Sequence, residues 1–234
     1  MSPTNWLSFG ADLWEIKRTD LIYELTAQQV VANYSTFPEN LVRGANNRLD
    51  GLGGYIRAGF VNADGDITRG VDLNARANGK VAGGNWVVNL DGTYLDSHRS
   101  RIFASQPYVE VVGKWSSRDL FVRWKHQASF TYSTGPWSGT LTQGFTAGYK
   151  DEVPGGTVPA GFTPDVKSYT LYDLALTYTG IKNLTVTGGI KNLLDTDPPF
   201  TAHNLDFAAG AGWDPRVADP RGRAFTLRVN YKFF

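Results

Sequence analysis

Cysteine is absent from the 234-residue sequence, which excludes a disulfide framework, a thiolate metal site and a cysteine nucleophile. Long apolar runs are absent as well, since no stretch approaches the roughly 20 consecutive apolar residues that a transmembrane helix requires. The charges are balanced, with 23 lysines and arginines against 22 aspartates and glutamates and a formal net charge of +1. This balance gives no reason to expect nucleic acid or another polyanion as a partner.

The start of the sequence carries no secretory signal. Met1 is followed by Ser-Pro-Thr-Asn-Trp, without the positively charged segment and the apolar segment that such a signal needs. If the mature protein acts beyond the inner membrane, we therefore expect this sequence to be a fragment, a truncated gene product or a shortened chain.

The composition favours many short β-strands. The chain holds 26 glycines, 7 tryptophans, 11 tyrosines and 13 phenylalanines, but only one methionine. Its length suits a single all-β domain. Apolar and polar residues alternate along several segments, which is the period of a strand, and helical spacing competes over no comparable length. Residues 20–31 alone are compatible with a short helix.

The last twelve residues show this alternation most clearly. One face of the segment carries Phe225, Leu227, Val229, Tyr231 and Phe233. The other face carries Thr226, Arg228, Asn230 and Lys232. An apolar face and a polar face over about 10 residues are what a tilted membrane strand requires.

The same pattern recurs along the chain. It predicts eight strands, at residues 6–18, 67–79, 85–98, 122–134, 137–150, 167–179, 183–194 and 223–234. One exception stands out, because Gln143 falls on the apolar face of its strand.

The connections between these strands alternate in length. Short, turn-like connections fall at residues 79–85, 134–137 and 179–183. Long connections fall at residues 18–66, 95–119, 151–167 and 196–221. Short turns at one end and long loops at the other are typical of an outer-membrane β-barrel, with the turns in the periplasm.

Aromatic residues cluster near the predicted strand ends. Trp86, Trp137 and Tyr178 lie by the short turns. Tyr94, Tyr149 and Tyr169 lie nearer the long loops. Such rings suit the two interfaces of a bilayer. A soluble β-sandwich also produces alternation, but the alternating loop lengths and the polar second face favour a barrel.

Several motifs resemble those of TonB-dependent receptors. The run Asn192-Leu-Leu-Asp-Thr-Asp-Pro-Pro-Phe200, followed by Gly212-Trp-Asp-Pro-Arg216 and Asp219-Pro-Arg-Gly-Arg223, is similar to the closing hairpin of that family. Further stretches also resemble the family: Ala11 to Ile22, Thr68-Arg-Gly-Val-Asp-Leu73, Trp124-Lys-His126, Gly135-Pro-Trp137 and Gly148-Tyr-Lys-Asp151. The resemblance therefore covers nearly the whole chain.

This resemblance implies an all-β, antiparallel transmembrane barrel segment of about eight strands, the last third of a 22-stranded barrel. Residues 1–234 would then be the C-terminal part of the barrel, without the plug domain and the N-terminal strands. The implied function is energised uptake through the bacterial outer membrane of a nutrient such as a ferric siderophore, cobalamin or an oligosaccharide. The implied partners are outer-membrane lipid, the barrel-assembly machinery, a plug domain, TonB and the small-molecule or oligosaccharide ligand.

The closing strand resembles the signal that the assembly machinery reads. Its outward row and terminal aromatic would be Phe225, Leu227, Val229, Tyr231, Phe233 and Phe234. Phe234 is one residue beyond the position that the register assigns to the terminal aromatic, so Phe233 is the alternative. These residues also suit simple contact with lipid.

No catalytic, cofactor or metal site is expected. His98, His126 and His203 are far apart, so we expect each to be an exposed or interfacial side chain. The run Asn62-Ala-Asp-Gly-Asp66 is similar to a calcium loop but lacks the downstream glutamate, so we expect a solvated turn.

The candidate ligand residues lie in the last long loop and on the polar strand faces. The loop candidates are Phe200, Phe207, Trp213, Asp214, Arg216, Asp219, Arg221 and Arg223. They are expected either to contact an anionic chelate or a sugar, or, as we favour, to form salt bridges between loops. The residues expected to line the lumen or meet the plug include Asp72, Asn74, Arg76, Asn89, Asp91, Arg228 and Lys232.

Two other functions fit parts of the pattern. A self-contained eight-stranded barrel would be a small structural or adhesion protein, because eight strands can close around their own side chains. A soluble β-sandwich could bind carbohydrate through exposed tryptophan and tyrosine. The missing signal and the motifs of a larger barrel count against the first, and the polar second face counts against the second.

Overall fold

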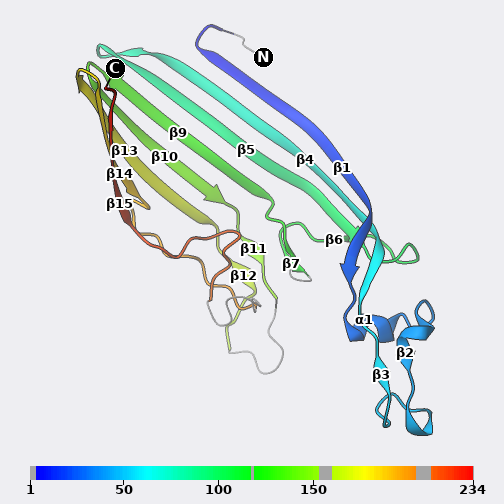
Figure 1. The fold of residues 1–234 in the computed structure, drawn as a ribbon. Coiled ribbons are helices and arrows are strands. Elements are labelled where there is room, and N and C mark those ends of the chain that lie inside the picture. The colour runs from blue at the N-terminus through cyan, green and yellow to red at the C-terminus, as the bar shows by residue number, and fades with distance from the viewer. Residues whose placement is uncertain (1–3, 117–118, 153–159, 204–211, 234) are drawn as a thin grey trace. The chain divides into compact units, whose positions relative to one another are not determined.

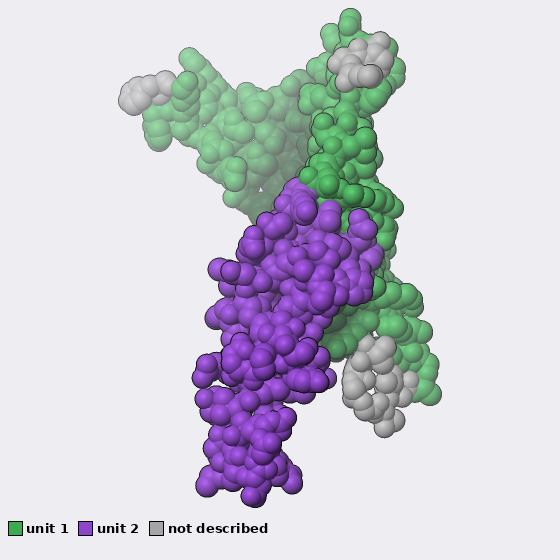
Figure 2. Space-filling view, turned by 90° about the vertical axis from the view of Figure 1, so that its right-hand side faces the viewer, with its two compact units in different colours: residues 1–15, 68–98, 111–234 green, residues 16–67, 99–110 purple. Residues whose placement is uncertain are grey.

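The protein is all-β and antiparallel in its main sheet (Figure 1). The structure, a computed structural model, describes residues 4–116, 119–152, 160–203 and 212–233. The chain divides into two compact units, coloured separately in Figure 2. Unit 1 comprises residues 1–15, 68–98 and 111–234, and unit 2 comprises residues 16–67 and 99–110. Each unit is described by itself.

The main sheet contains the eight strands that the alternation predicts, in the order of the sequence. They are β1 (Leu7–Glu24), β4 (Phe60–Val81), β5 (Gly84–Arg101), β9 (Trp124–Thr134), β10 (Trp137–Thr146), β13 (Tyr169–Ile181), β14 (Leu184–Lys191) and β15 (Ala224–Tyr231). A short ninth strand, β6 (Val109–Glu110), pairs with β5. β1 and β15 stand at the two ends of the strand order, so the path is open among the described residues.

Two strand ends differ most from the prediction. β1 continues to Glu24 and β4 starts at Phe60, so the long connection between them is shorter than expected. Charged side chains hold these extensions together in unit 2, because the Arg18 guanidinium pairs with Asp66 and Arg101 pairs with Asp64. Alternation of apolar and polar residues does not reveal a ladder that continues through ion pairs.

The register confirms one apolar face and one polar face. A single row crosses six neighbouring strands through paired residues on the apolar face. The row consists of Val88, Phe130, Leu141, Leu174, Ile190 and Phe225. Several members of this face are exposed large side chains, including Phe130, Leu176, Leu227 and Val229. The sheet therefore presents an apolar surface that no described part of the chain covers.

The opposite face carries hydroxyl groups that bond to one another across strands. The Oγ1 atoms of Thr131 and Thr140 are 2.9 Å apart. Those of Thr177 and Thr187 are 3.0 Å apart. The predicted lumen residues Asn89, Asp91 and Arg228 share this face by register. Two hydrogen bonds place Asp72 and Arg76 on the same face, because Thr93 donates to Asp72 and Arg76 donates to Asn89. Lys232 lies just beyond β15.

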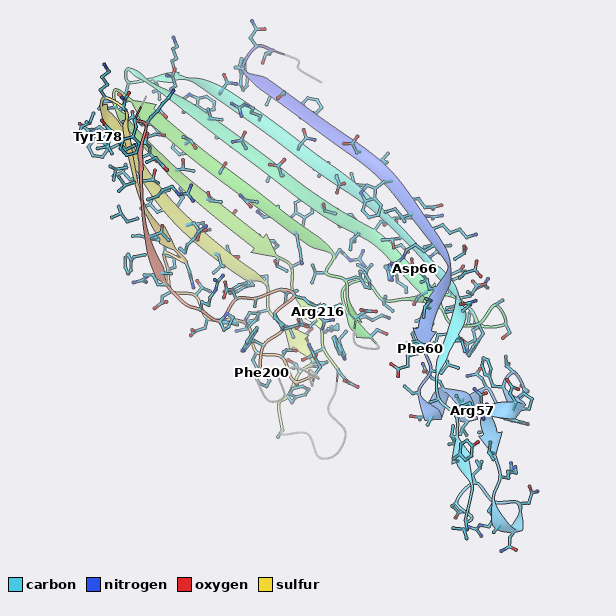
Figure 3. All side chains as sticks on the ribbon, viewed as in Figure 1. Arg57, Phe60, Asp66, Tyr178, Phe200 and Arg216 are labelled. Atoms are coloured by element: carbon cyan, nitrogen blue, oxygen red, sulfur yellow. The ribbon has the colours of Figure 1, made fainter. Side chains whose placement is uncertain are left out.

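Tight turns join the strands at one end of the sheet, at the upper left in Figure 1. Ala82, Gly83, Gly135 and Asn183 adopt positive φ angles in these turns, as sharp reversals require. Tyr178 lies at this end (Figure 3), where its ring contacts Trp137 at a centroid distance of 4.5 Å. The long connections lie at the other end of the same strands.

The prediction that Tyr149 and Tyr169 lie at the bilayer interface near the long loops is wrong. Both side chains are buried. Tyr169 pairs with Thr146 on the polar face, and its hydroxyl donates to the Asp219 carbonyl. Tyr149 packs with Val122 and Val166, because the predicted strand 137–150 ends at Thr146 and the chain turns away from the sheet.

Short strand pairs build the long connections of unit 1. β7 (Trp115–Ser116) pairs with β8 (Asp119–Leu120), and β11 (Tyr149–Lys150) pairs with β12 (Asp165–Val166). An isolated bridge joins Lys114 to Lys150.

Among the residues that the structure describes, the helical ones lie in unit 2. These are α1 (Ala27–Ala32), the 3-10 turns Pro38–Asn40 and Ala45–Asn47, and the strand pair β2 (Leu41–Val42) and β3 (Tyr55–Ile56). The predicted helix at 20–31 is therefore limited to α1, which begins after Thr26 in a capping box with Gln29. Among the described residues, no helix combines the length and apolar character needed to cross a membrane.

The expected solvated turn at Asn62–Asp66 is also wrong. These residues lie inside β4, and the Asp66 side chain is buried against Arg18. The carboxylates that resemble calcium ligands in the sequence are occupied by arginines.

Candidate functional site

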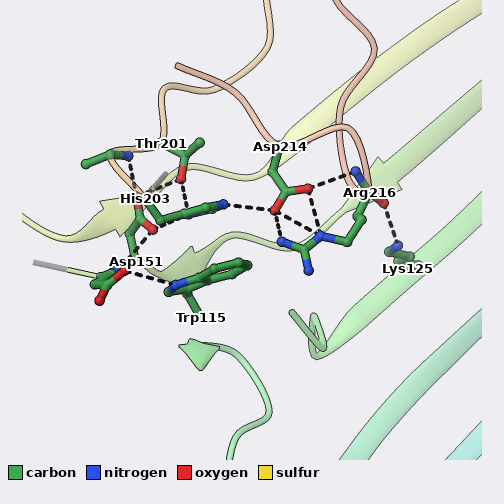
Figure 4. A network of polar contacts seen from close by, with 9 residues as sticks. Trp115, Lys125, Asp151, Thr201, His203, Asp214 and Arg216 are labelled. Atoms are coloured by element: carbon green, nitrogen blue, oxygen red, sulfur yellow. Dashed lines mark hydrogen bonds and ion pairs between the residues drawn. The ribbon is translucent and has the colours of Figure 1, made fainter. Parts of the chain in front are cut away.

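Three connections of unit 1 meet in one polar network at the loop end of the sheet (Figure 4). Trp115 comes from β7, and Asp151 follows β11. The connection between β14 and β15 supplies the other members, Thr201, His203, Asp214 and Arg216. Figure 3 shows Arg216 in this region, with Phe200 nearby.

His203 is the centre of the network. Its side chain is fully buried, with Nδ1 2.5 Å from Asp151 Oδ1 and Nε2 3.0 Å from Asp214 Oδ2. The imidazole also stacks on the Trp115 indole at a centroid distance of 3.9 Å. The expectation of an exposed or interfacial histidine is therefore wrong here, since the partner carboxylates are 52 and 11 residues away in sequence.

The two carboxylates of this network are held in their charged form. Burial acts to raise the pKa of Asp151, but hydrogen bonds from Thr201, the Ala202 amide and His203 outweigh it, so that the pKa lies below its usual value. Burial likewise opposes ionisation of Asp214, and hydrogen bonds from Arg216 keep its pKa lowered. The network therefore carries fixed charges with specific partners.

An Asp-Pro-Arg sequence occurs twice in this loop. In each copy the arginine guanidinium donates hydrogen bonds to the carboxylate of the aspartate two residues before it, and the arginine backbone amide donates to the same carboxylate. Asp214 is 0% exposed and Arg216 34%, whereas Asp219 is 41% exposed and Arg221 84%. The first copy also packs on aromatic surface, because the Arg216 guanidinium lies 4.6 Å from the Trp115 ring centroid.

A cavity of about 540 Å³ lies between this loop and the polar face of the sheet. Strand residues of the polar face line it, together with loop residues Pro215 and Val217 to Asp219. The polar strand residues are Asp91, Thr93, Lys125, Gln127, Thr146 and Tyr169. Lys125 Nζ also lies 3.4 Å from the Arg216 carbonyl oxygen. Such a lining offers an ammonium group, carboxylates, an amide and hydroxyls to a polar solute.

Only part of this lining can be identified from the sequence. Asp91 and Asp219 were candidates, but Lys125, Gln127 and Tyr169 were not. The alternation along β9 could have indicated Lys125 and Gln127, since both share the parity of the polar residue Ser129. Tyr169 could not be recognised, because its phenol resembles that of an interfacial residue.

The remaining candidates are spread around the network. Phe200 is exposed, and Trp213 is half-buried. The Arg223 backbone amide donates to Asp195. Phe207 lies outside the described residues. The predicted assembly row has its apolar side chains exposed, with Tyr231 and Phe233 in edge-to-face contact, and Phe234 also lies outside the described residues.

The other two histidines differ in surroundings. His98 is buried, contrary to expectation, with its ring stacked on Phe121 and Nδ1 2.7 Å from Thr68 Oγ1. His126 is half-buried on the apolar face. In the part of the chain that the structure describes, no group of three or more histidine or carboxylate side chains is arranged to hold a metal ion.

The sequence matches a protein family, and the fold is similar to solved structures. Residues 2–193 match the family described as TonB dependent receptor-like, beta-barrel. No curated protein matches the chain in sequence. A mutant of the ferric enterobactin receptor of Pseudomonas aeruginosa has a similar fold, with 18% identity, a TM-score of 0.57, and 98% of this chain and 29% of that chain covered.

Two other solved structures have comparable folds. The copper transporter OprC has 15% identity and a TM-score of 0.55, and the match covers 98% of this chain and 29% of that one. The siderophore receptor PiuA of Acinetobacter baumannii has 17% identity and a TM-score of 0.51, with 97% and 26% covered. This chain spans less than a third of the length of each of these proteins.

Proposed function

Because the chain belongs to the TonB-dependent receptor-like β-barrel family, we propose that it forms part of the wall of a bacterial outer-membrane receptor that imports a scarce nutrient. The observation that carries this proposal is the two-faced sheet, with an exposed apolar row across six strands and paired hydroxyls on the opposite face. In an outer-membrane barrel the apolar face meets lipid and the polar face lines the lumen. A receptor wall has no catalytic role.

The chain is proposed to be the C-terminal part of a 22-stranded barrel. Supporting this assignment, the eight strands follow one another in sequence order along an open path. The motifs in residues 192–223 are similar to the family's closing hairpin. A plug domain and TonB are then partners of the complete receptor, and the barrel-assembly machinery is the proposed reader of the last strand.

The ligand is proposed to be a small polar nutrient, of the class that includes ferric siderophores, metal ions, cobalamin and oligosaccharides. The solved structures of similar fold include a ferric enterobactin receptor and a copper transporter. The cavity supports a polar solute, because Lys125, Asp91 and Gln127 supply both donors and acceptors. The network around His203 would hold the loop above this cavity in one shape.

Membrane fractionation and uptake test this function together. We expect the protein in the outer-membrane fraction, extractable only with detergent, and we expect loss of growth on one limiting nutrient when its gene is deleted. Lys125→Ala should weaken that growth, while Lys80→Ala, on an exposed strand end, should not. A protein that is monodisperse in water without detergent would contradict the membrane assignment, since the apolar face would then be covered.

A self-contained eight-stranded barrel would give the same fractionation result. It would require β1 to pair with β15, which the described strand order does not contain. Cross-linking of cysteines placed at facing positions of β1 and β15 separates the two arrangements, because only a closed eight-stranded barrel would form the link.

A further inference from the structure

Polar side chains form a chain of hydrogen bonds on the apolar face of the sheet. Trp124 Nε1 donates to His126 Nδ1 over 2.7 Å. His126 Nε2 lies 3.2 Å from Gln143 Oε1, and Gln143 Nε2 donates to the Tyr172 hydroxyl over 2.8 Å. Because Nδ1 accepts, Nε2 carries the proton and donates. This chain crosses β9, β10 and β13, and it explains why a glutamine lies on an otherwise apolar face.

This chain of hydrogen bonds leaves two donors unused. Gln143 has a second amide hydrogen, and the Tyr172 hydroxyl has its own hydrogen, and neither has an acceptor among the described residues. A polar hydrogen that faces hydrocarbon without an acceptor is strongly unfavourable, because it loses its hydrogen bond to water and gains none in return. Both residues lie in the half of their strands that leads to the long loops. An acceptor that does not belong to the protein is therefore expected beside Gln143 and Tyr172.

A groove opens beside the end of these hydrogen bonds that lies nearer the long loops. Its volume is about 520 Å³, and its walls include Tyr94, Trp124, Gly148 to Lys150, and Val166. Arg123 also lines it, with its guanidinium 5.9 Å from the Tyr94 ring centroid.

Arg123 is the available cation of this groove. Its Nη1 donates to the carbonyl oxygens of Leu95 and Asp96, over 3.4 and 3.1 Å. No carboxylate of the described residues forms an ion pair with it, whereas the other cation in the lining, Lys150, pairs with Asp165. A guanidinium retains free donors in this position, and phosphate matches their geometry.

We propose that this groove binds the phosphate-bearing headgroup of an outer-membrane lipid. Arg123 would hold the phosphate, and the Tyr94 and Trp124 rings would flank the headgroup. The unused donors of Gln143 and Tyr172 would meet the ester carbonyls below it. The acyl chains would lie on the exposed row that contains Phe130 and Leu141. A free anion would account for Arg123 alone, whereas a lipid accounts for the cation, the two donors and the apolar row together.

This inference rests on the proposed membrane location of the sheet. Its test uses the protein purified in detergent and titrated with mixed micelles that contain either phosphatidylglycerol or diacylglycerol, which has the same ester carbonyls but no phosphate, with binding followed by native mass spectrometry. We expect the protein to prefer the anionic lipid. Arg123→Gln should reduce that preference about fivefold, as expected for one basic residue near an anionic surface. Arg123→Lys should retain most of the preference.

Two further variants separate the headgroup from the acyl region. Gln143→Leu should weaken the binding of both lipids alike, because it removes a donor to an ester carbonyl that the two lipids share. Lys182→Gln removes a positive charge from the tight turn at the other end of these strands and should change nothing. A normal shift of electrophoretic mobility on heating shows that each variant is folded.

Each remaining outcome is decisive. Equal binding of both lipids, unchanged in Arg123→Gln, would leave only an apolar contact and would overturn the proposal. Inorganic phosphate that competes at concentrations similar to the anionic lipid would show an anion site without lipid recognition, which also overturns it. A protein that needs no detergent would refute the membrane function itself, whereas the first two outcomes leave that function intact.

Discussion

The repeated Asp-Pro-Arg sequence provides an internal comparison of a buried and an exposed ion pair. We consider Asp214→Asn and Asp219→Asn, which remove one negative charge from each copy with almost no change in volume. The local hydrogen bonds match, since Nε donates to Oδ1 over 2.9 Å in both copies. Burial differs, since the first carboxylate is 0% exposed and the second 41%. Any difference between the variants therefore reports on the surroundings.

The buried copy should matter far more. Asp214→Asn weakens charge-assisted hydrogen bonds to Arg216 and leaves His203 without its charged partner at Nε2. Breaking a buried, hydrogen-bonded pair of this kind is unfavourable by about 2–4 kcal/mol, or roughly a hundredfold increase in local opening of the loop. Asp219→Asn disrupts a pair that water already solvates, and the opening should change less than about fivefold.

Hydrogen exchange measures this opening directly. The Ala218 amide donates to the Asp214 carbonyl and reports on the loop. We expect faster exchange there in Asp214→Asn and near-normal exchange in Asp219→Asn, with unchanged exchange in β9 as a check on the fold. Equal effects of the two substitutions would refute the reasoning, because burial would then not determine the strength of these pairs.

Three further outcomes follow from the structure. The network should lose stability in acid: the lowered pKa values of Asp151 and Asp214 mean that their contribution is complete above the unfolded value of about 4 and is lost as the pH falls through the lower folded values. The near-ultraviolet circular dichroism signal of Trp115, measured against pH, checks this prediction. A network that loses stability when the pH is raised from 5 to 8 would contradict it. Gly84→Ala should lower the melting temperature, by the equivalent of about 1–3 kcal/mol, because the added methyl group would meet a backbone oxygen at 2.6 Å. Gly144→Ala, with nothing within 4 Å, is its control, and equal melting temperatures would count against a tightly packed strand start. Phe233→Ser should reduce the amount of protein in the outer membrane severalfold if the last strand is an assembly signal, whereas the control Lys232→Ser should not. Equal amounts of the two variants would leave only a lipid-contact role for Phe233.

The strands of the sheet could be predicted because their signal is local. Each of the eight segments alternates with period two, and residues such as Phe225 and Thr226 declare opposite faces from sequence alone. The prediction failed where pairing depends on charge. Arg18 and Asp66 extend β1 and β4 through an ion pair between residues 48 positions apart, and no local pattern marks that distance.

The loop network was beyond prediction for the same physical reason. Asp214 and Arg216 could be recognised as a pair because they are two residues apart. His203 and Asp151 could not, since the loop geometry that brings them together depends on packing against Trp115. The same limit applies to Gln143, which the alternation marks as an exception without showing that His126 and Tyr172 are its partners.

The paired hydroxyls of the polar face have a consequence for movement along it. Thr131 with Thr140 and Thr177 with Thr187 satisfy one another, so that each hydroxyl already has a partner before any solute arrives. A solute that slides over them exchanges one weak neutral hydrogen bond for another and meets no deep energy minimum. Strong binding would then be confined to the charged cavity near the loops. The part of the polar face nearer the tight turns would let a released solute diffuse onward without capture.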